Sequence, residues 1–142
     1  MVMNTTAPTP IASTESRPGR PLTIALWVVQ IGLALMFFMA GGNKLAGNPM
    51  MVGLFSAIGI GQWFRYVTGA LEVAGAALLL VPRISGLGAA LLVPVMLGAI
   101  TTHLVVLHNS PAMPLGLLAA LAFVAWGRRD QILGAVRRSV RY

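Results

Sequence analysis

The sequence contains no cysteine and very few charged residues. The absence of cysteine excludes disulfides, thiolate nucleophiles, iron–sulfur ligation and CxxC redox chemistry. Any redox role would therefore need a bound cofactor or a partner chain. Charged residues make up 9% of the 142 residues and hydrophobic residues 57%, whereas about 25% of a soluble domain is charged. One domain of this size could not hide so much apolar surface from water, so we expect lipid to be its solvent.

Acidic residues and histidines are too few to suggest a metal or haem site. The apolar region has one Glu and two His, which are too few ligands for a typical metal site, so we predict no metal. His103 and His108 are five residues apart on one predicted helix, a spacing that does not suit two axial ligands approaching a haem from opposite faces. P-loop, dinucleotide-binding and nucleophile-elbow motifs are absent. Whether the chain is an enzyme stays open: at most it is a subunit or a cofactor-dependent oxidoreductase.

Four apolar stretches predict an all-α integral membrane protein, an up-down bundle of four transmembrane helices. The predicted spans cover residues 22–42, 64–81, 84–107 and 112–127. They divide the chain into a disordered cytoplasmic tail (1–21), the transmembrane domain (22–129) and a basic cytoplasmic tail (130–142), which forms an amphipathic helix or a loose segment.

A short apolar repeat lies between the first two predicted spans. Met51, Leu54, Phe55 and Ile58 follow the i, i+3, i+4, i+7 spacing of one helix face. This pattern indicates a short amphipathic helix lying in the membrane interface, and a plain loop is the alternative.

The basic residues are concentrated on one side of the predicted bundle. Lys44 and Arg65 lie on the other side. The eight on the side of the termini are Arg17, Arg20, Arg83, Arg128, Arg129, Arg137, Arg138 and Arg141. The positive-inside rule therefore predicts that both termini lie in the cytoplasm. Basic residues beside a span suit an anionic membrane surface, so we expect no nucleic acid partner.

Glu72 is the most informative single residue. A carboxyl group in hydrocarbon is costly, so it normally faces the interior of a bundle and has a partner. It lies seven residues after Arg65, roughly 10 Å deeper at 1.5 Å per residue. Two interpretations stay open: a group that handles a proton or anchors a ligand, and a structural ion pair with Lys44 or Arg65.

The remaining candidates lie on neighbouring predicted helices. His103 follows Thr102 near the outer end of the third span; it relays a proton, orients a ligand, or is merely hydrogen-bonded to a neighbouring helix. Gln30 is the interior polar residue of the first span and faces the core or a small-residue contact. We therefore predict Glu72 and His103 as catalytic residues. The predicted ligand-binding residues are Lys44, Arg65, Gln30 and Thr102.

Four motifs, in this order and spacing, resemble those of the DoxX-like family of the DoxX superfamily. The motifs are Gln30–Leu45, which ends in Gly-x-x-Lys-Leu; Gly69-Ala-Leu-Glu72-Val-Ala-Gly75; Gly98-Ala-Ile-Thr-Thr-His103; and Phe123-Val-Ala-Trp-Gly-Arg128. The resemblance covers about residues 22–129 and implies a four-helix membrane fold. Many DoxX proteins have Arg and Gly where this chain has Gln30 and Ala34, so it is more similar to the DoxX-like branch.

The resemblance implies a membrane protein of unassigned activity, with a link to membrane redox systems. Our leading hypothesis is a multi-pass protein of the bacterial cytoplasmic (inner) membrane whose outer polar cluster binds a quinone or another small hydrophobic molecule. Glu72 would accept a proton or hydrogen bond with help from His103, while Lys44 and Arg65 hold the negative charge. The alternatives are a non-enzymatic scaffold or assembly subunit, and a proton or small-solute pathway that needs a homo-oligomer. The expected partners are the lipid bilayer, a membrane or redox protein and a second copy, and no cofactor is evident beyond the quinone.

Overall fold

The structure is a computed structural model that describes residues 19–140, within which there are six helices and no strands. The helices are α1 (Arg20–Leu45), α2 (Pro49–Ile58), α3 (Gln62–Leu79), α4 (Ser85–Val105), α5 (Ala112–Gly127) and α6 (Arg129–Ser139). The expectation of an all-α protein is thus met over this range. The predicted tail of residues 1–21 falls outside the described residues as far as residue 18, and α1 already begins at Arg20.

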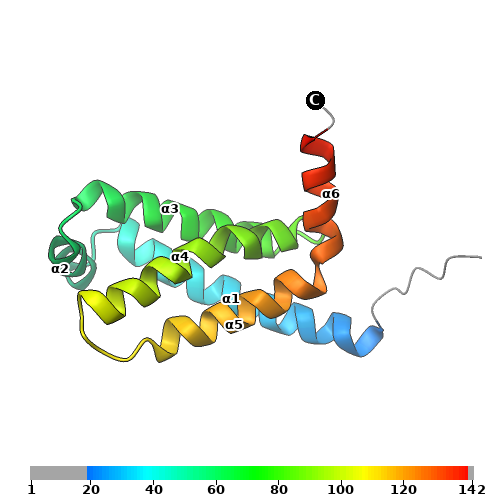
Figure 1. The fold of residues 1–142 in the computed structure, drawn as a ribbon, viewed down its shortest axis with the longest axis horizontal. Helices are drawn as coiled ribbons and strands as arrows, with labels where there is room; N and C mark the ends of the chain where they lie inside the picture. The colour runs from blue at the N-terminus through cyan, green and yellow to red at the C-terminus, as the bar shows by residue number, and fades with distance from the viewer. Residues whose placement is uncertain (1–18, 141–142) are drawn as a thin grey trace, which may run out of the picture.

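Four of the helices form the body of the molecule, which we define as α1, α3, α4 and α5. They run side by side in alternating directions, and each contacts the next in the ring α1–α3–α4–α5 and back to α1 (Figure 1). The α2 end holds α2, the start of α3 and the α4–α5 connection, and the α6 end holds α6, the start of α1 and the α3–α4 turn (Figure 1). This arrangement brings the end of α1, the start of α3 and the end of α4 to the α2 end.

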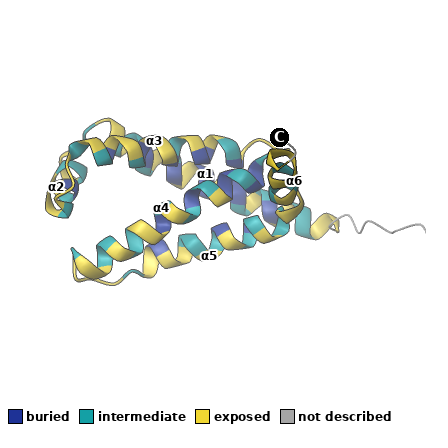
Figure 2. Ribbon diagram, turned by 45° about the horizontal axis from the view of Figure 1, so that its top comes forward, coloured by how far each residue is buried: buried dark blue, intermediate teal, exposed yellow. Residues whose placement is uncertain are grey.

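The body has a narrow apolar core and an apolar exterior. The core contains Leu33, Phe37, Leu79, Leu92, Leu121 and Val124. The outward faces of the helices remain exposed (Figure 2), and on α1 they carry Val28, Leu35 and Met39, which are 66%, 61% and 70% exposed. By length and composition, α1 and α4 could cross a membrane, while α2 and α5 are shorter apolar helices. An apolar exterior around an apolar core suits a lipid solvent.

The helix α2 has a defined start and end although only one of its residues is buried. The Asn48 side chain accepts a hydrogen bond from the backbone N–H of Met50 at 3.0 Å, which is an N-cap. Gly59 ends the helix in the left-handed conformation with φ +78°, where a glycine avoids steric strain. Phe55 is its buried residue and packs against Phe64 of α3 with ring centroids 5.8 Å apart. The apolar repeat of 51–58 is therefore helical.

Candidate functional site

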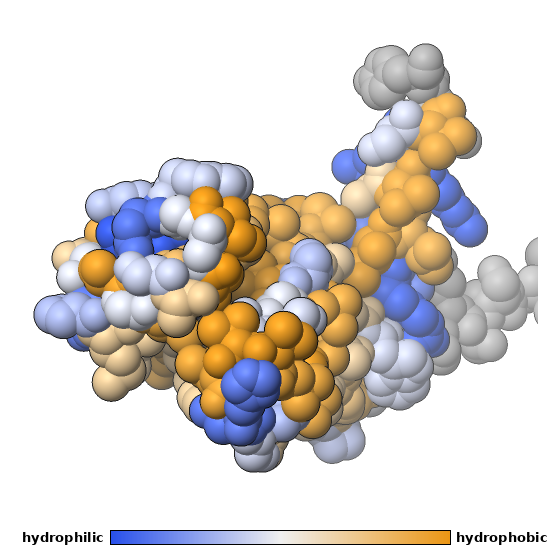
Figure 3. All heavy atoms as spheres, turned by 60° about the vertical axis from the view of Figure 1, so that its left-hand side comes forward, coloured by the Kyte–Doolittle hydropathy of each residue, from blue (hydrophilic) through white to orange (hydrophobic). Residues whose placement is uncertain are grey.

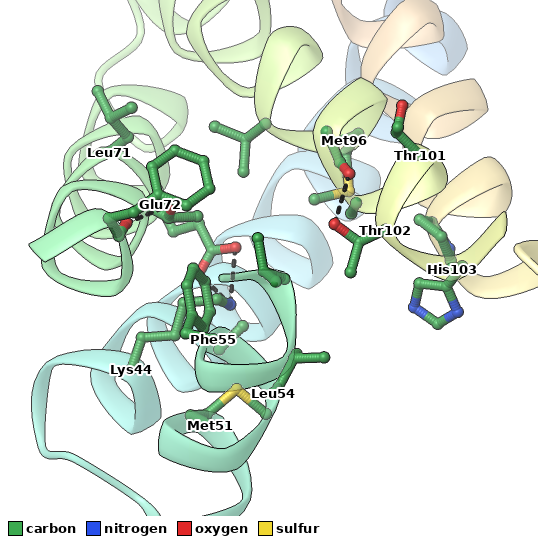
Figure 4. Close-up of a pocket in the computed structure, with 18 of the residues that line it drawn as sticks. Lys44, Met51, Leu54, Phe55, Leu71, Glu72, Met96, Thr101, Thr102 and His103 are labelled. Atoms are coloured by element: carbon green, nitrogen blue, oxygen red, sulfur yellow. Dashed lines mark hydrogen bonds and ion pairs between the residues drawn. The ribbon is translucent and has the colours of Figure 1, made fainter. Parts of the chain in front are cut away.

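The polar centre of the site is an ion pair between α1 and α3. Lys44 Nζ lies 2.9 Å from Oε1 and 2.8 Å from Oε2 of Glu72, so the ammonium contacts both carboxylate oxygens (Figure 4). The side chains are 13% and 4% exposed. Of the two partners that the sequence offered for Glu72, the structure selects Lys44.

Two glycines explain why these side chains meet. A Cβ on Gly41 would lie 2.8 Å from the carbonyl oxygen of Gly69, and one on Gly69 would lie 3.0 Å from Cβ of Lys44. Because neither residue has a side chain, the backbones of α1 and α3 touch at this level. Each glycine lies three residues before its charged residue, which places Lys44 and Glu72 on the contacting faces.

Arg65 supports the pair from outside the cavity. Its Nη1 donates to the carbonyl oxygen of Lys44, and its Nε donates to Oε1 of Gln62 at 2.8 Å. The guanidinium also lies 4.2 Å from the ring centroid of Tyr66. A cation on one of the last carbonyls of a helix is favourable, because those groups have no partner within the helix. Arg65 therefore fixes the end of α1 on α3, and it does not line the cavity.

A cavity of about 710 Å³ opens beside the ion pair. The four helices of the body and α2 contribute to its walls, and hydrophobic atoms border the hollow at the α2 end of the molecule (Figure 3). The lining residues nearest the ion pair and α2 are Met36, Ala40, Met51, Leu54, Phe55, Ile58, Phe64 and Thr68. The whole apolar stripe of α2 thus faces the cavity; that α2 lies in the membrane interface stays a prediction.

Thr102 and His103 face the same cavity from α4, on the side opposite the ion pair (Figure 4). The Thr102 hydroxyl donates to the carbonyl oxygen of Gly98 at 3.0 Å and keeps its lone pairs free to accept. His103 Nδ1 lies 2.7 Å from Oδ1 of Asn109 in the α4–α5 connection, a contact that orients the ring. Neither residue has a hydrogen bond to Lys44 or Glu72, so the predicted cluster is two groups separated by an apolar space.

Gln30 lies elsewhere, fully buried toward the α6 end. It is fourteen residues before Lys44 on the same helix, about 21 Å at 1.5 Å per residue. Its Nε2 donates to the carbonyl oxygen of Leu79 at 2.8 Å, and its Oε1 accepts from Nε of Arg128 at 3.2 Å. Gln30 thus joins α1 to α3 and to the end of α5, and it does not line the cavity.

Sequence reasoning missed the apolar walls of the cavity. The available signal was helical spacing that leads to the charged residues: Met36 and Ala40 precede Lys44 at intervals of four, and Phe64 and Thr68 precede Glu72 in the same way. Within residues 19–140, no group of three acidic or histidine side chains could hold a metal ion. The site therefore offers one ion pair, one imidazole and the hydroxyls of three threonines (Thr68, Thr101 and Thr102) around a large apolar space.

The comparison with known families gives a match over most of the body. The DoxX-like family model matches residues 28–126, a range that includes α2, α3, α4 and nearly all of α5 together with the ion pair, Thr102 and His103. The match ends before α6. Comparisons with curated proteins and with solved structures gave no match.

Proposed function

The chain belongs to the DoxX-like family, a family of membrane proteins, and from this premise we propose that it binds a quinone or a similar small apolar molecule. The cavity beside the Lys44–Glu72 pair would hold this ligand. The protein would act as a four-helix, four-span component of a redox system in a bacterial cytoplasmic membrane, and the ion pair would supply the polar contacts.

The four-span arrangement is supported by what surrounds α1 and α4. With 18 and 16 residues, α3 and α5 extend about 27 Å and 24 Å at 1.5 Å per residue, close to the ~30 Å hydrocarbon core. Both α3 and α5 pack along α1 and α4. A bilayer that surrounds α1 and α4 therefore also surrounds α3 and α5. Exposed aromatic residues at the two ends, Trp63 and Trp126, suit the two interfaces.

The observation that carries the ligand proposal is the chemistry of the cavity. Its volume of about 710 Å³ lies within the range of small-molecule sites, roughly 300–1,000 Å³, which combine apolar walls with a few polar groups. The Lys44 ammonium has three N–H donors, and its two contacts with the Glu72 carboxylate occupy two of these donors. Lys44 therefore has a donor left for a carbonyl oxygen of the ligand.

The remaining polar groups suit the reduced form of such a ligand. A quinol hydroxyl is a donor, and the lone pairs of the Glu72 carboxylate and of the Thr102 hydroxyl are acceptors at the cavity surface. His103, held by Asn109, is a group that can take up a proton on the opposite side. Because the chain has no cysteine, electrons would come from a redox partner or a soluble reductant.

A second candidate function is a scaffold that assembles or stabilises another membrane complex. It is favoured by the position of the ion pair between two helices, because Lys44 and Glu72 neutralise each other and Arg65 binds the backbone of Lys44. These contacts lock α1 to α3 without any ligand. In that case, substitutions in the pair would affect stability while the cavity would have no specific occupant.

The test compares two identical substitutions. Ala99 lines the cavity, whereas Ala122 is exposed on α5. Ala99→Leu should fill part of the cavity and weaken binding of a short-chain quinone by about tenfold or more, the equivalent of about 1.4 kcal/mol, and Ala122→Leu should leave binding unchanged. Tryptophan fluorescence in mild detergent would report the binding, and mass spectrometry would identify extracted ligands. The ligand proposal fails if nothing quinone-like or lipid-like is extracted and both variants bind equally.

A further inference from the structure

The helix α6 has an apolar face that the described part of the chain leaves uncovered. Leu133, Val136 and the C-cap residue Val140 recur at intervals of three and four and are 51%, 55% and 79% exposed. No residue of α6 is buried. An isolated helix of 11 residues is marginal in water, so an apolar surface that covers this face would stabilise it.

The direction of α6 indicates what that surface is. The helix stands across the α6 end of the body and does not continue the line of α5 (Figure 1). Seen from the side of the α2 end, its hydrophobic atoms face the viewer and hydrophilic atoms flank them (Figure 3). Since the axis of the body is the membrane normal in the four-span arrangement, the apolar face of α6 points toward the acyl chains.

Side-chain contacts hold α6 in this direction. Gln131 Oε1 accepts from the backbone N–H of Gly86 at 2.9 Å, and Gln131 Nε2 donates to the carbonyl oxygen of Pro82 at 2.7 Å. By helical spacing, Gln131 lies nearly opposite Leu133 and Val136. The α3–α4 turn and the start of α4 thus bind the polar side of α6 and leave the apolar side free.

The charges on α6 are those that anionic lipid attracts. Arg129, Arg137 and Arg138 lie on it beside a single acid, Asp130. The guanidinium of Arg129 lies 5.4 Å from the ring centroid of Trp126, which is 57% exposed. A Trp with flanking arginines beside an exposed apolar face is typical of a helix that lies in a membrane interface.

We propose that α6 lies in the plane of the cytoplasmic membrane surface, where it docks on anionic phospholipids. Leu133, Val136 and Val140 enter the boundary between headgroups and acyl chains, and the arginines bind the phosphates. The helix thereby anchors the α6 end at a fixed depth. This inference rests on the proposed membrane arrangement of the body.

Because the sequence has no cysteine, a single introduced cysteine can be spin-labelled without first removing any native one. Val136→Cys places a label on the apolar face, and Gly134→Cys places one on the other side, where an added Cβ meets nothing within 4 Å. The proteins would be reconstituted in phosphatidylcholine bilayers with or without phosphatidylglycerol. With phosphatidylglycerol, oxygen should reach the label at 136 more readily than a water-soluble nickel complex does, and the label at 134 should show the reverse.

Arginine substitutions test the role of charge. Arg137→Gln with Arg138→Gln should lower the ratio of docked to undocked α6 by up to roughly thirtyfold in phosphatidylglycerol bilayers, from about 1 kcal/mol per basic residue. The same pair should change little in pure phosphatidylcholine. Equal docking in both lipids would overturn the anionic preference. A label at 136 that both reagents fail to reach would indicate a protein on this face and overturn the proposal.

A third label separates this inference from the proposed membrane arrangement. Leu35 lies midway along α1 and is 61% exposed, so a label on Leu35→Cys should be deep in the bilayer. If position 35 is deep while 136 is open to nickel, α6 is not docked although the body spans the membrane. If position 35 is also open to nickel, the membrane arrangement itself is wrong and the inference falls with it.

Discussion

At the scale of single residues, Lys44 and Glu72 should behave as one unit. Breaking a buried ion pair leaves an uncompensated charge, so Lys44→Met and Glu72→Met should each lower the free energy of unfolding by about 3 kcal/mol. The double variant should lose clearly less than the sum, because no charge is left unpaired. Unfolding titrations of the three variants in detergent would measure the coupling.

The same cycle separates the two candidate functions. If the cavity binds a ligand through the pair, the double variant should fold and still bind a quinone poorly. Additive losses of stability would contradict the coupling that the two Nζ–carboxylate contacts imply. Full stability together with full binding would leave the pair without a role in the site.

Two adjacent glycines on α1 should respond in opposite ways to alanine. An added Cβ at Gly41 would lie 2.8 Å from a backbone oxygen of Gly69, whereas one at Gly42 meets nothing within 4 Å. Gly41→Ala should therefore separate α1 from α3 and cost about 1–3 kcal/mol. Gly42→Ala should gain up to about 1 kcal/mol from helix propensity. Thermal unfolding in detergent would show the difference, and equal effects would contradict the close approach of the two helices.

At the scale of elements, the stability of α2 should depend on its cap. Removing the Asn48 cap by Asn48→Ala should cost about 1 kcal/mol and raise hydrogen exchange of residues 49–58 about fivefold. Gly53→Ala is a control on the same helix, with open space around the new Cβ, and it should slow exchange instead. Because α2 covers the cavity, the Asn48 variant should also release ligand faster. An unchanged exchange pattern in both variants would show that packing alone holds α2.

The elements differ in how far the sequence could predict them. For α5 the predicted and observed ranges coincide at 112–127, and α3 and α4 end within two residues of their predicted ends, because long apolar runs stop at polar turns. For residues 130–142 a helix and a loose tail were equally compatible with the pattern, and the structure has α6 as far as Ser139. The apolar spacing on α2 predicted a helix, but it did not predict what the apolar face contacts, because the same spacing suits a face toward lipid and a face toward a cavity.

The candidate site was less predictable, because it depends on depth and rotation of whole helices. The choice of Lys44 over Arg65 as partner of Glu72 follows from the contact at Gly41 and Gly69, which sets how α1 is turned toward α3. Gln30 lies on the same helix as Lys44, but its distance along the axis removes it from the cavity. Residue types suggest partners, whereas helix packing decides among them.

At the scale of the whole molecule, the two ends of the body should lie on opposite sides of the membrane. Ser110 lies in the α4–α5 connection at the α2 end, and Ser139 ends α6 at the other. Both are exposed, so Ser110→Cys and Ser139→Cys are closely matched substitutions in a chain without cysteine. An impermeant maleimide should label position 110 in intact cells and position 139 only after the membrane is opened.

The same two labels also distinguish an arrangement with two spans from one with four. If only α1 and α4 crossed the bilayer, the α4–α5 connection and α6 would lie on the same side, and both positions would react alike. If four helices cross but the orientation is reversed, position 139 would react in intact cells and position 110 would not. The concentration of arginine at the α6 end favours that end in the cytoplasm. Label at 110 alone is therefore the result that four spans with this orientation require.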